Sequence, residues 1–301
     1  CSQTFKCSTN YLGNNFLCYI CRSKKNTNKV MLFLNSYTDI FQHISSFFDN
    51  ETNLSLFRTN KYYSKNEKLY ANLIRNKEWT VQSLNKHIRR DFHIHAKKFV
   101  IDKIGQLEYI YNGLKSNRLF NIKKFKFISP FNEKIPKNLL PSTLDNIEFS
   151  CEYNYSFEKD FLPKKLRVLS LSNTFNQIIK PGSLPDSLSE LVTGNSYDRE
   201  FKKGVLPKYL QALHLGIHYN RDFQKGILPD TLELLKFGCL FNKKIEKDIY
   251  PPELRCLILG CRYDKEIKKN ELPSTITHLV IGRSYPCKLQ KEMLPKKLKN
   301  L

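Results

Sequence analysis

Residues 184–205 read LPDSLSELVTGNSYDREFKKGV, and the same order of apolar and polar residues recurs every 22 residues through the second half of the chain. The Leu-Pro pair that opens this stretch marks each copy, with Tyr250 replacing the leucine once. The marks stand at Leu140-Pro141, Leu162-Pro163, Leu184-Pro185, Leu206-Pro207, Leu228-Pro229, Tyr250-Pro251, Leu272-Pro273 and Leu294-Pro295. Such fixed spacing without insertions predicts a solenoid, in which each coil packs only on its neighbours.

Each copy carries a short apolar pattern after its Leu-Pro mark. When the copies are aligned one above another, equivalent positions form columns. The columns of Leu188 and Leu191 are apolar in every copy, and Thr193 is the one polar residue of the next apolar column. The last two columns have the period of two that a strand with one buried face requires. A serine or glycine follows, which predicts a turn where neighbouring coils come close together. We therefore expect one strand per coil and a parallel sheet.

Two further columns follow the turn. The first is wholly aromatic: Phe131, Tyr153, Phe175, Tyr197, Tyr219, Phe241, Tyr263 and Tyr285. The second holds Asn132, Asn154, Asn176, Asp198, Asn220, Asn242 and Asp264, until Pro286 interrupts it. Short Asn and Asp side chains bond readily to nearby backbone amides, so we expect this column to form a ladder between coils.

The Leu-x-x-Leu-x-Leu core of each copy resembles a leucine-rich repeat, although the aromatic-Asn pair stands where that pattern usually has its asparagine. Phe131-Asn132-Glu133-Lys134-Ile135, Phe175-Asn176-Gln177-Ile178-Ile179 and Phe241-Asn242-Lys243-Lys244-Ile245 closely resemble the FNIP repeat, a variant known from amoebae and giant viruses. The resemblance covers 118–301 and implies a leucine-rich-repeat-like solenoid of about eight coils, the last one incomplete. With the helical module described next, the expected fold class is an α+β repeat protein.

Residues 30–95 have the rhythm of helices. One helical face is predicted to carry Ile40, Phe41, Ile44 and Phe47, and a second helix to carry Leu54 and Phe57; another helical segment is expected from Trp79 onward. The stretch DIFQHISSFFDNETNLSLFRTNKYY resembles a degenerate F-box, which implies that these six side chains bind a Skp-type adaptor of a cullin-RING ubiquitin ligase. The alternative is a helical cap that only covers the first coil.

The remaining segments carry less pattern. Residues 96–117 are out of register with the repeat and are expected to form an irregular cap or linker, and 1–29 form an N-terminal extension. That extension holds Cys1, Cys7, Cys18 and Cys21, whose spacing is unlike the two close pairs of a structural zinc site, so we expect no metal. Cys239 and Cys261 share one column and would stack on adjacent coils, but in a reducing compartment free thiols are the expectation.

The net charge of +22 first suggests nucleic acid. The excess is spread evenly, however, at +10 over residues 1–117 and +12 over 118–301. One column is basic in six copies, at Lys159, Lys203, Lys225, Lys247, Lys269 and Lys291. Acidic neighbours flank several of these, so we expect a solvated face, and nucleic-acid binding is disfavoured. No apolar run reaches the length of a membrane span, and an intracellular, cytoplasmic protein is expected, with the nucleus as the other compartment to consider.

No paired carboxylates, phosphate loop or nucleophile motif accompanies the scattered histidines, so neither catalysis nor a cofactor is expected. The open face of the strands varies from copy to copy while the buried columns do not. One open-face column reads Val192, His214, Lys236, Ile258 and Val280, and we expect it to bind a target protein. The leading hypothesis is a substrate-recognition adaptor of a ubiquitin ligase; the alternatives are a stand-alone repeat scaffold and, less favoured, a basic nucleic-acid binder.

Overall fold

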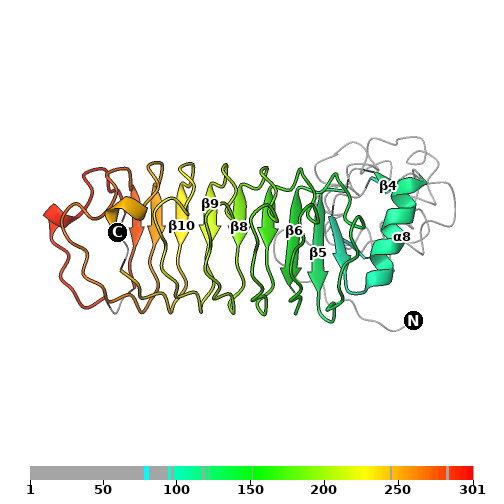
Figure 1. Cartoon of the computed structure of the whole chain (residues 1–301), viewed down its shortest axis with the longest axis horizontal. Coiled ribbons are helices and arrows are strands. Elements are labelled where there is room, and N and C mark those ends of the chain that lie inside the picture. The colour runs from blue at the N-terminus through cyan, green and yellow to red at the C-terminus, as the bar shows by residue number, and fades with distance from the viewer. Residues whose placement is uncertain are drawn as a thin grey trace, which may run out of the picture. The chain divides into compact units, whose positions relative to one another are not determined.

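The computed structural model describes residues 78–80, 94–95, 98–116, 119–120, 122–150, 152–244, 246–282 and 285–300. The chain divides into two compact units, 1–74 and 75–301, and every described residue belongs to the second. That second unit is a solenoid whose strands run side by side along its length (Figure 1). The expected repeat solenoid is thereby confirmed.

Ten strands form one parallel sheet in the order β1-β3-β5-β6-β7-β8-β9-β10-β11-β12. The strands are β1 (Glu78–Thr80), β3 (Lys98–Ile101), β5 (Lys124–Ile128), β6 (Asn146–Ser150), β7 (Val168–Ser170), β8 (Glu190–Val192), β9 (Ala212–His214), β10 (Leu234–Lys236), β11 (Cys256–Ile258) and β12 (His278–Val280). From β5 onward each residue pairs with the one 22 positions later, as Leu191 pairs with Leu213. The period of the sequence is therefore the register of the sheet.

The core is the stack of inward columns. The central residue of each short strand is fully buried, as Leu191 and Leu213 show with 0% exposure. The aromatic column lies beneath the sheet, with the ring planes of Tyr197 and Tyr219 within 5° of parallel and their centroids 6.3 Å apart. A coil of 22 residues cannot enclose such a core alone, so each coil depends on its neighbours for burial.

Glycine follows the strands from β8 to β12 because the coils approach each other there. A Cβ at Gly216 would overlap the backbone carbonyl of Gly194 in the preceding coil, and the same relation recurs at Gly238. The turn expected at this column is thus a point of backbone contact between coils, which excludes a side chain.

The coil between β3 and β5 has a different construction. Its register offset is 26 residues, because Phe99 pairs with Phe125, and it contains the helix α8 (Ile104–Lys115). The helix buries Leu107 and Ile110, and its first amide, from Ile104, donates to the Glu133 carboxylate of the next coil at 2.9 Å. In Figure 1 this helix lies at the β5 end of the row of strands. Of the segment 96–117, which was expected to be irregular, the described residues 98–116 contain a regular strand and helix, which give that coil an apolar face of its own.

Two short elements complete this end, β2 (Ile94–His95) and β4 (Leu119–Phe120), which pair as a separate parallel ribbon. The expected helical module, 30–95, overlaps the described residues only at β1 and β2, and both are strands. The helix expected from Trp79 is wrong at 78–80, because backbone pairing with β3 outweighs the local helical pattern. Besides α8, the described residues contain only two short 3₁₀ turns, at Lys247–Ile249 and Lys291–Met293. Helix content in the described part is thus small.

Candidate functional site

The candidate site is the open face of the parallel sheet, where strand side chains alternate with the buried ones. The five predicted target-binding residues occupy one row on β8 to β12, because consecutive members are direct register partners: Val192, His214, Lys236, Ile258 and Val280. None of the five is buried, and Val280 is 49% exposed. The same backbone position thus carries an aliphatic, an aromatic or a basic side chain, depending on the strand.

Polar groups cross the middle of this face. The Nε2 atom of His214 lies 3.6 Å from a carboxylate oxygen of Glu190 on the adjacent strand. Burial lowers the pKa of His214, and Lys236 lowers it further, while Glu190 opposes both. The lowered pKa favours the neutral imidazole near pH 7. In the row, His214 lies between Val192 and Lys236, and Ile258 follows Lys236, so two adjacent polar side chains interrupt the apolar ones.

A basic cluster occupies the other end of the same face. It consists of Lys98, Lys124 and Lys126 with one carboxylate, Glu148. Lys124 and Lys126 place their Nζ atoms 2.8 Å and 3.1 Å from that carboxylate. Partial burial alone would raise the pKa of Glu148, but hydrogen bonds from Lys124, Ser150 and Lys126 lower it to about 2. The cluster thus keeps an excess of positive charge at every pH near neutrality.

Sequence reasoning missed this cluster because no Leu-Pro mark precedes β3 or β5, so their lysines were not aligned with the open-face columns. The signal was nevertheless present, since KFKFI at 124–128 alternates with the period of a half-buried strand. Extending the open-face columns upstream, as the aromatic column was extended to Phe131, would have placed Lys124 and Lys126 beside Glu148.

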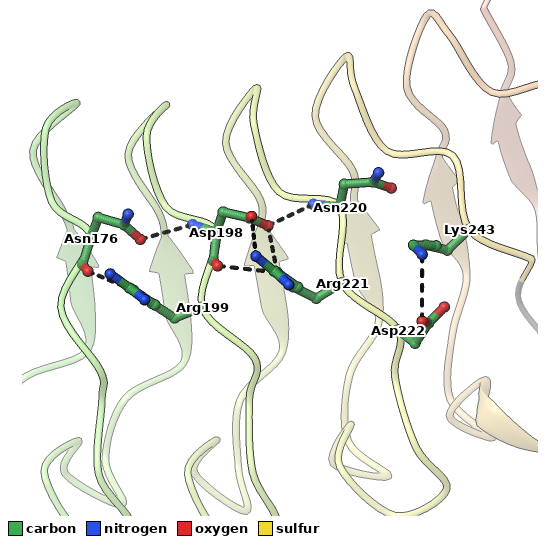
Figure 2. A network of polar contacts seen from close by, with 7 residues as sticks. All are labelled: Asn176, Asp198, Arg199, Asn220, Arg221, Asp222 and Lys243. Carbon is green, nitrogen blue, oxygen red and sulfur yellow. Dashed lines mark hydrogen bonds and ion pairs between the residues drawn. The ribbon is translucent and has the colours of Figure 1, made fainter.

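The expected asparagine ladder forms along the side of the solenoid from Asn154 to Asp264. Each side-chain oxygen accepts the backbone N–H of the residue 22 positions later, over 2.9 to 3.1 Å. Figure 2 shows two of these steps, from Asn176 to Asp198 and from Asp198 to Asn220. Pro286 has no N–H and cannot continue the series. The ladder fixes the spacing of the coils and hence that of the open face; Asn132 contributes its carbonyl to the Tyr155 hydroxyl instead.

Arginines reinforce the ladder from the next column. The Arg221 guanidinium donates twice to the Asp198 carboxylate, at 3.0 Å from Nε and 2.6 Å from the terminal nitrogen, and its pKa is raised by that bond (Figure 2). Arg199 donates from Nε to the backbone carbonyl of Asn176 at 2.9 Å. These arginines therefore serve the coil-to-coil contact.

The lysine column lies on exposed turns at the opposite edge of each coil. Lys203 is the second residue of a turn closed by the Val205 N–H and the Lys202 carbonyl, 3.1 Å apart, and Gly204 has a φ of 80°. Positive φ recurs at this column, at Asn138, Asp160, Gly182, Gly204, Gly226 and Asn270. A type II turn needs such a residue at its third position, and the recurring Gly, Asn or Asp was a readable signal that our sequence analysis overlooked. The Lys225 ammonium lies 3.8 Å from Asp248, and both side chains are about three-quarters exposed.

Cys239 and Cys261 are joined as a disulfide across adjacent coils, with their Cα atoms 4.8 Å apart. The expectation of free thiols is wrong for this pair, because the 22-residue register places these two side chains of one column directly against each other on adjacent coils. Cys256 is a half-buried free thiol whose pKa burial raises. Among the described residues, no group of three or more histidine, cysteine or carboxylate side chains is placed to hold a metal ion.

The predicted adaptor-binding residues, Ile40, Phe41, Ile44, Phe47, Leu54 and Phe57, lie outside the described residues, as do the four N-terminal cysteines, Cys1, Cys7, Cys18 and Cys21. The structure therefore places the five predicted target-binding residues in one row. The adaptor-binding role of the other six stays a prediction. In the part of the chain that is described, no helix has the length and apolar character to cross a bilayer.

One parallel strand per coil, an apolar stack beneath it and a variable open face define a repeat solenoid of the leucine-rich type. The FNIP Repeat model matches more than half of the chain, at residues 131–174, 175–218, 198–240, 219–262 and 263–301. The chain therefore belongs to the FNIP repeat family, as the resemblance implied. Comparison with curated proteins finds no match.

A solved structure with a similar fold is CroV588, whose crystal structure is described as a novel circular LRR protein structure. The two chains are 31% identical with a TM-score of 0.53. The match covers 61% of this chain but only 30% of the CroV588 chain, so this chain spans less than a third of that protein.

Proposed function

We propose that this chain is a non-enzymatic protein-binding protein whose open sheet face holds a target protein. The observation that carries the proposal is the contrast between columns: the inward positions repeat in kind, while Val192, His214, Lys236, Ile258 and Val280 differ on successive strands. A rigid scaffold with side chains that vary only where they meet solvent is how repeat proteins acquire specificity. The FNIP and leucine-rich-repeat similarities are consistent with this function.

The finer form of the proposal is a substrate-recognition subunit of a cullin-RING ubiquitin ligase. Residues 30–95 would bind a Skp-type adaptor through Ile40, Phe41, Ile44, Phe47, Leu54 and Phe57, while the repeats hold the substrate. This part rests on the F-box resemblance of the sequence alone. Its cytoplasmic setting follows from the same proposal, since the ligase acts there.

The adaptor half is tested by capture of a purified Skp-type adaptor on the full chain. The wild type is expected to retain the adaptor and Ile44→Asp to retain at least ten-fold less of it, since the change replaces a proposed apolar anchor with a charge. The matched control is Ile178→Asp, an apolar-to-acid change at a repeat side chain that is 58% exposed. Equal retention by all three proteins would contradict the adaptor role and favour the stand-alone scaffold.

The target half is tested separately with the double variant Val192→Asp/Ile258→Asp, which places two charges in the open-face row. Loss of a captured partner by this variant, with adaptor binding intact, is the expected result. A partner retained by it and lost instead by Lys203→Glu/Lys225→Glu, with steep salt dependence, would favour the nucleic-acid alternative.

A further inference from the structure

The open face is electrically asymmetric along the solenoid, and the asymmetry bears on what the face binds. Over β3 to β6 the charged open-face residues are Lys98, Lys124, Lys126 and Glu148, which sum to +2, and Glu78 of β1, the register partner of Lys98, lowers the sum at this end of the sheet to +1. Over β7 to β12 the charged residues are Glu190 and Lys236, which cancel. The apolar open-face residues of this second half are Val168, Val192, Ala212, Leu234, Ile258 and Val280.

The basic end is short of negative charge by construction. Lys98 and Lys124 are direct register partners on adjacent strands, so like charges face each other. Glu148 is shared by Lys124 and Lys126 and also accepts the Ser150 hydroxyl at 2.7 Å. The single charge of Glu148 cannot neutralise both of the ammonium groups that share it, and the other nearby carboxylate, Glu78, is in register with Lys98.

These charges are held in place close to the sheet. The Lys124 and Lys126 side chains are only 25% and 32% exposed, so their ammonium groups are partly desolvated and already ordered. An acidic side chain that reaches them meets stronger attraction than at a fully exposed lysine, and little side-chain entropy remains to be lost.

We propose that the open face binds an extended protein segment that crosses the strands, with acidic side chains over β3 to β6 and apolar side chains over β7 to β12. This inference rests on the proposed function and specifies its partner. Nine strands spaced about 4.8 Å apart span roughly 38 Å, which an extended segment of about 12 residues covers. A nucleic acid fits less well, because its phosphates would complement the basic end and gain nothing over the apolar half.

The experiment selects binders from a random 12-residue peptide library displayed on phage, with the full chain as bait. An enriched peptide is then synthesised with a fluorophore, and its dissociation constant is measured by anisotropy against the wild type and four variants. The charge-reversal variant is Lys124→Glu/Lys126→Glu, and its matched control is Lys203→Glu/Lys225→Glu, which makes the same net change on the turn edge. The apolar variant is Val192→Asp/Ile258→Asp.

The fourth variant, Glu148→Gln, is expected to change the affinity in the opposite direction. Removing this carboxylate raises the local excess of positive charge, so acidic peptides are expected to bind several-fold more tightly at low salt. A residue with only a structural role would weaken binding or leave it unchanged when altered. Thermal unfolding of each variant shows that a loss of binding is not a loss of folding.

The inference predicts enriched peptides with Asp and Glu at one end and apolar residues at the other. Lys124→Glu/Lys126→Glu should weaken them at least ten-fold and the turn-edge control should not. If the enriched peptides are neutral or basic but bind Val192→Asp/Ile258→Asp more weakly than the wild type, the inference is overturned and the proposed function stands. Peptides that bind every open-face variant as tightly as the wild type would overturn both the inference and the proposed function. A single-stranded oligonucleotide that displaces the peptides from the basic end would overturn the inference and indicate a nucleic-acid ligand instead.

Discussion

The inward and outward faces of the same strands differ in almost every respect. On β9, Leu213 points inward with 0% exposure, and its column is apolar in every coil. Its neighbour His214 points outward, and the residues in its column change from Val192 to Lys236 within two coils. Because successive side chains of a strand point to opposite faces, residues that stabilise the core and residues that contact a partner are different residues. Each set can therefore change without the other.

The largest effect should come from the inward column. Leu213→Ala is expected to lower the free energy of unfolding by about 3 kcal/mol, because it opens a cavity between three coils. The control is Leu234→Ala, the same chemical change on the partly exposed outer face of β10, with an expected cost of about 1 kcal/mol. Urea unfolding of both proteins gives the comparison, and equal losses would show that the two faces are not energetically distinct.

The glycine column should be the next most sensitive. Gly216→Ala places a methyl group into the Gly194 carbonyl, and moving packed backbone is expected to cost about 2 kcal/mol. Gly204→Asn is the control, because it keeps a positive φ that Asn138 and Asn270 already adopt in the same column and has open space around it. Thermal unfolding should show a large shift for Gly216→Ala and almost none for Gly204→Asn. The opposite order would contradict the close approach of the coils.

The ladder should contribute a moderate amount. Asn220→Ala leaves the Asn242 N–H without its acceptor, at an expected cost of about 1 kcal/mol in the free energy of unfolding. Asn220→Asp keeps an acceptor oxygen there, as Asp198 does in the preceding coil, so it should cost much less. Chemical denaturation of the pair isolates the acceptor, and an alanine variant as stable as the aspartate would mean that water replaces it.

The smallest effect is expected inside the core. The hydroxyl of Tyr219 is buried without a hydrogen-bond partner in the described part of the chain, and burial raises its pKa. Phenylalanine already stands in this column at Phe175 and Phe241. Tyr219→Phe should therefore leave stability unchanged or raise it by about 0.5 kcal/mol, since an unpaired polar atom is removed. A clear loss in urea unfolding would reveal a partner for the hydroxyl.

Prediction from sequence succeeded where one coil repeats the next. Residues Leu191 and Leu213 were placed in one buried column, and Asn176 and Asp198 in one ladder, because a 22-residue period leaves a single consistent register. The same logic placed Cys239 against Cys261, although the disulfide itself was not expected. Wherever the repeat holds, the position of a residue within its copy predicts which residues of the neighbouring coils it contacts.

Prediction failed where the repeat does not hold. The coil with α8 has an offset of 26 residues, so no column carried Lys98 and Lys124 into alignment. Strand pairing of 78–80 was missed because three residues carry too little pattern, and their structure depends on β3. The basic cluster of the open face belongs to this end of the sheet and was missed with it.

The amino-acid sequence by itself determined the solenoid, its register, its buried columns and the row of variable residues on its open face. It could do so because neighbouring coils have the same length, so that periodicity alone states which residues touch. Only the tertiary structure decided that Glu148 is shared by two lysines beside a third and that Cys239 and Cys261 are bonded. The period places these residues opposite one another, but whether opposed side chains bond depends on their individual conformations, which the period does not specify.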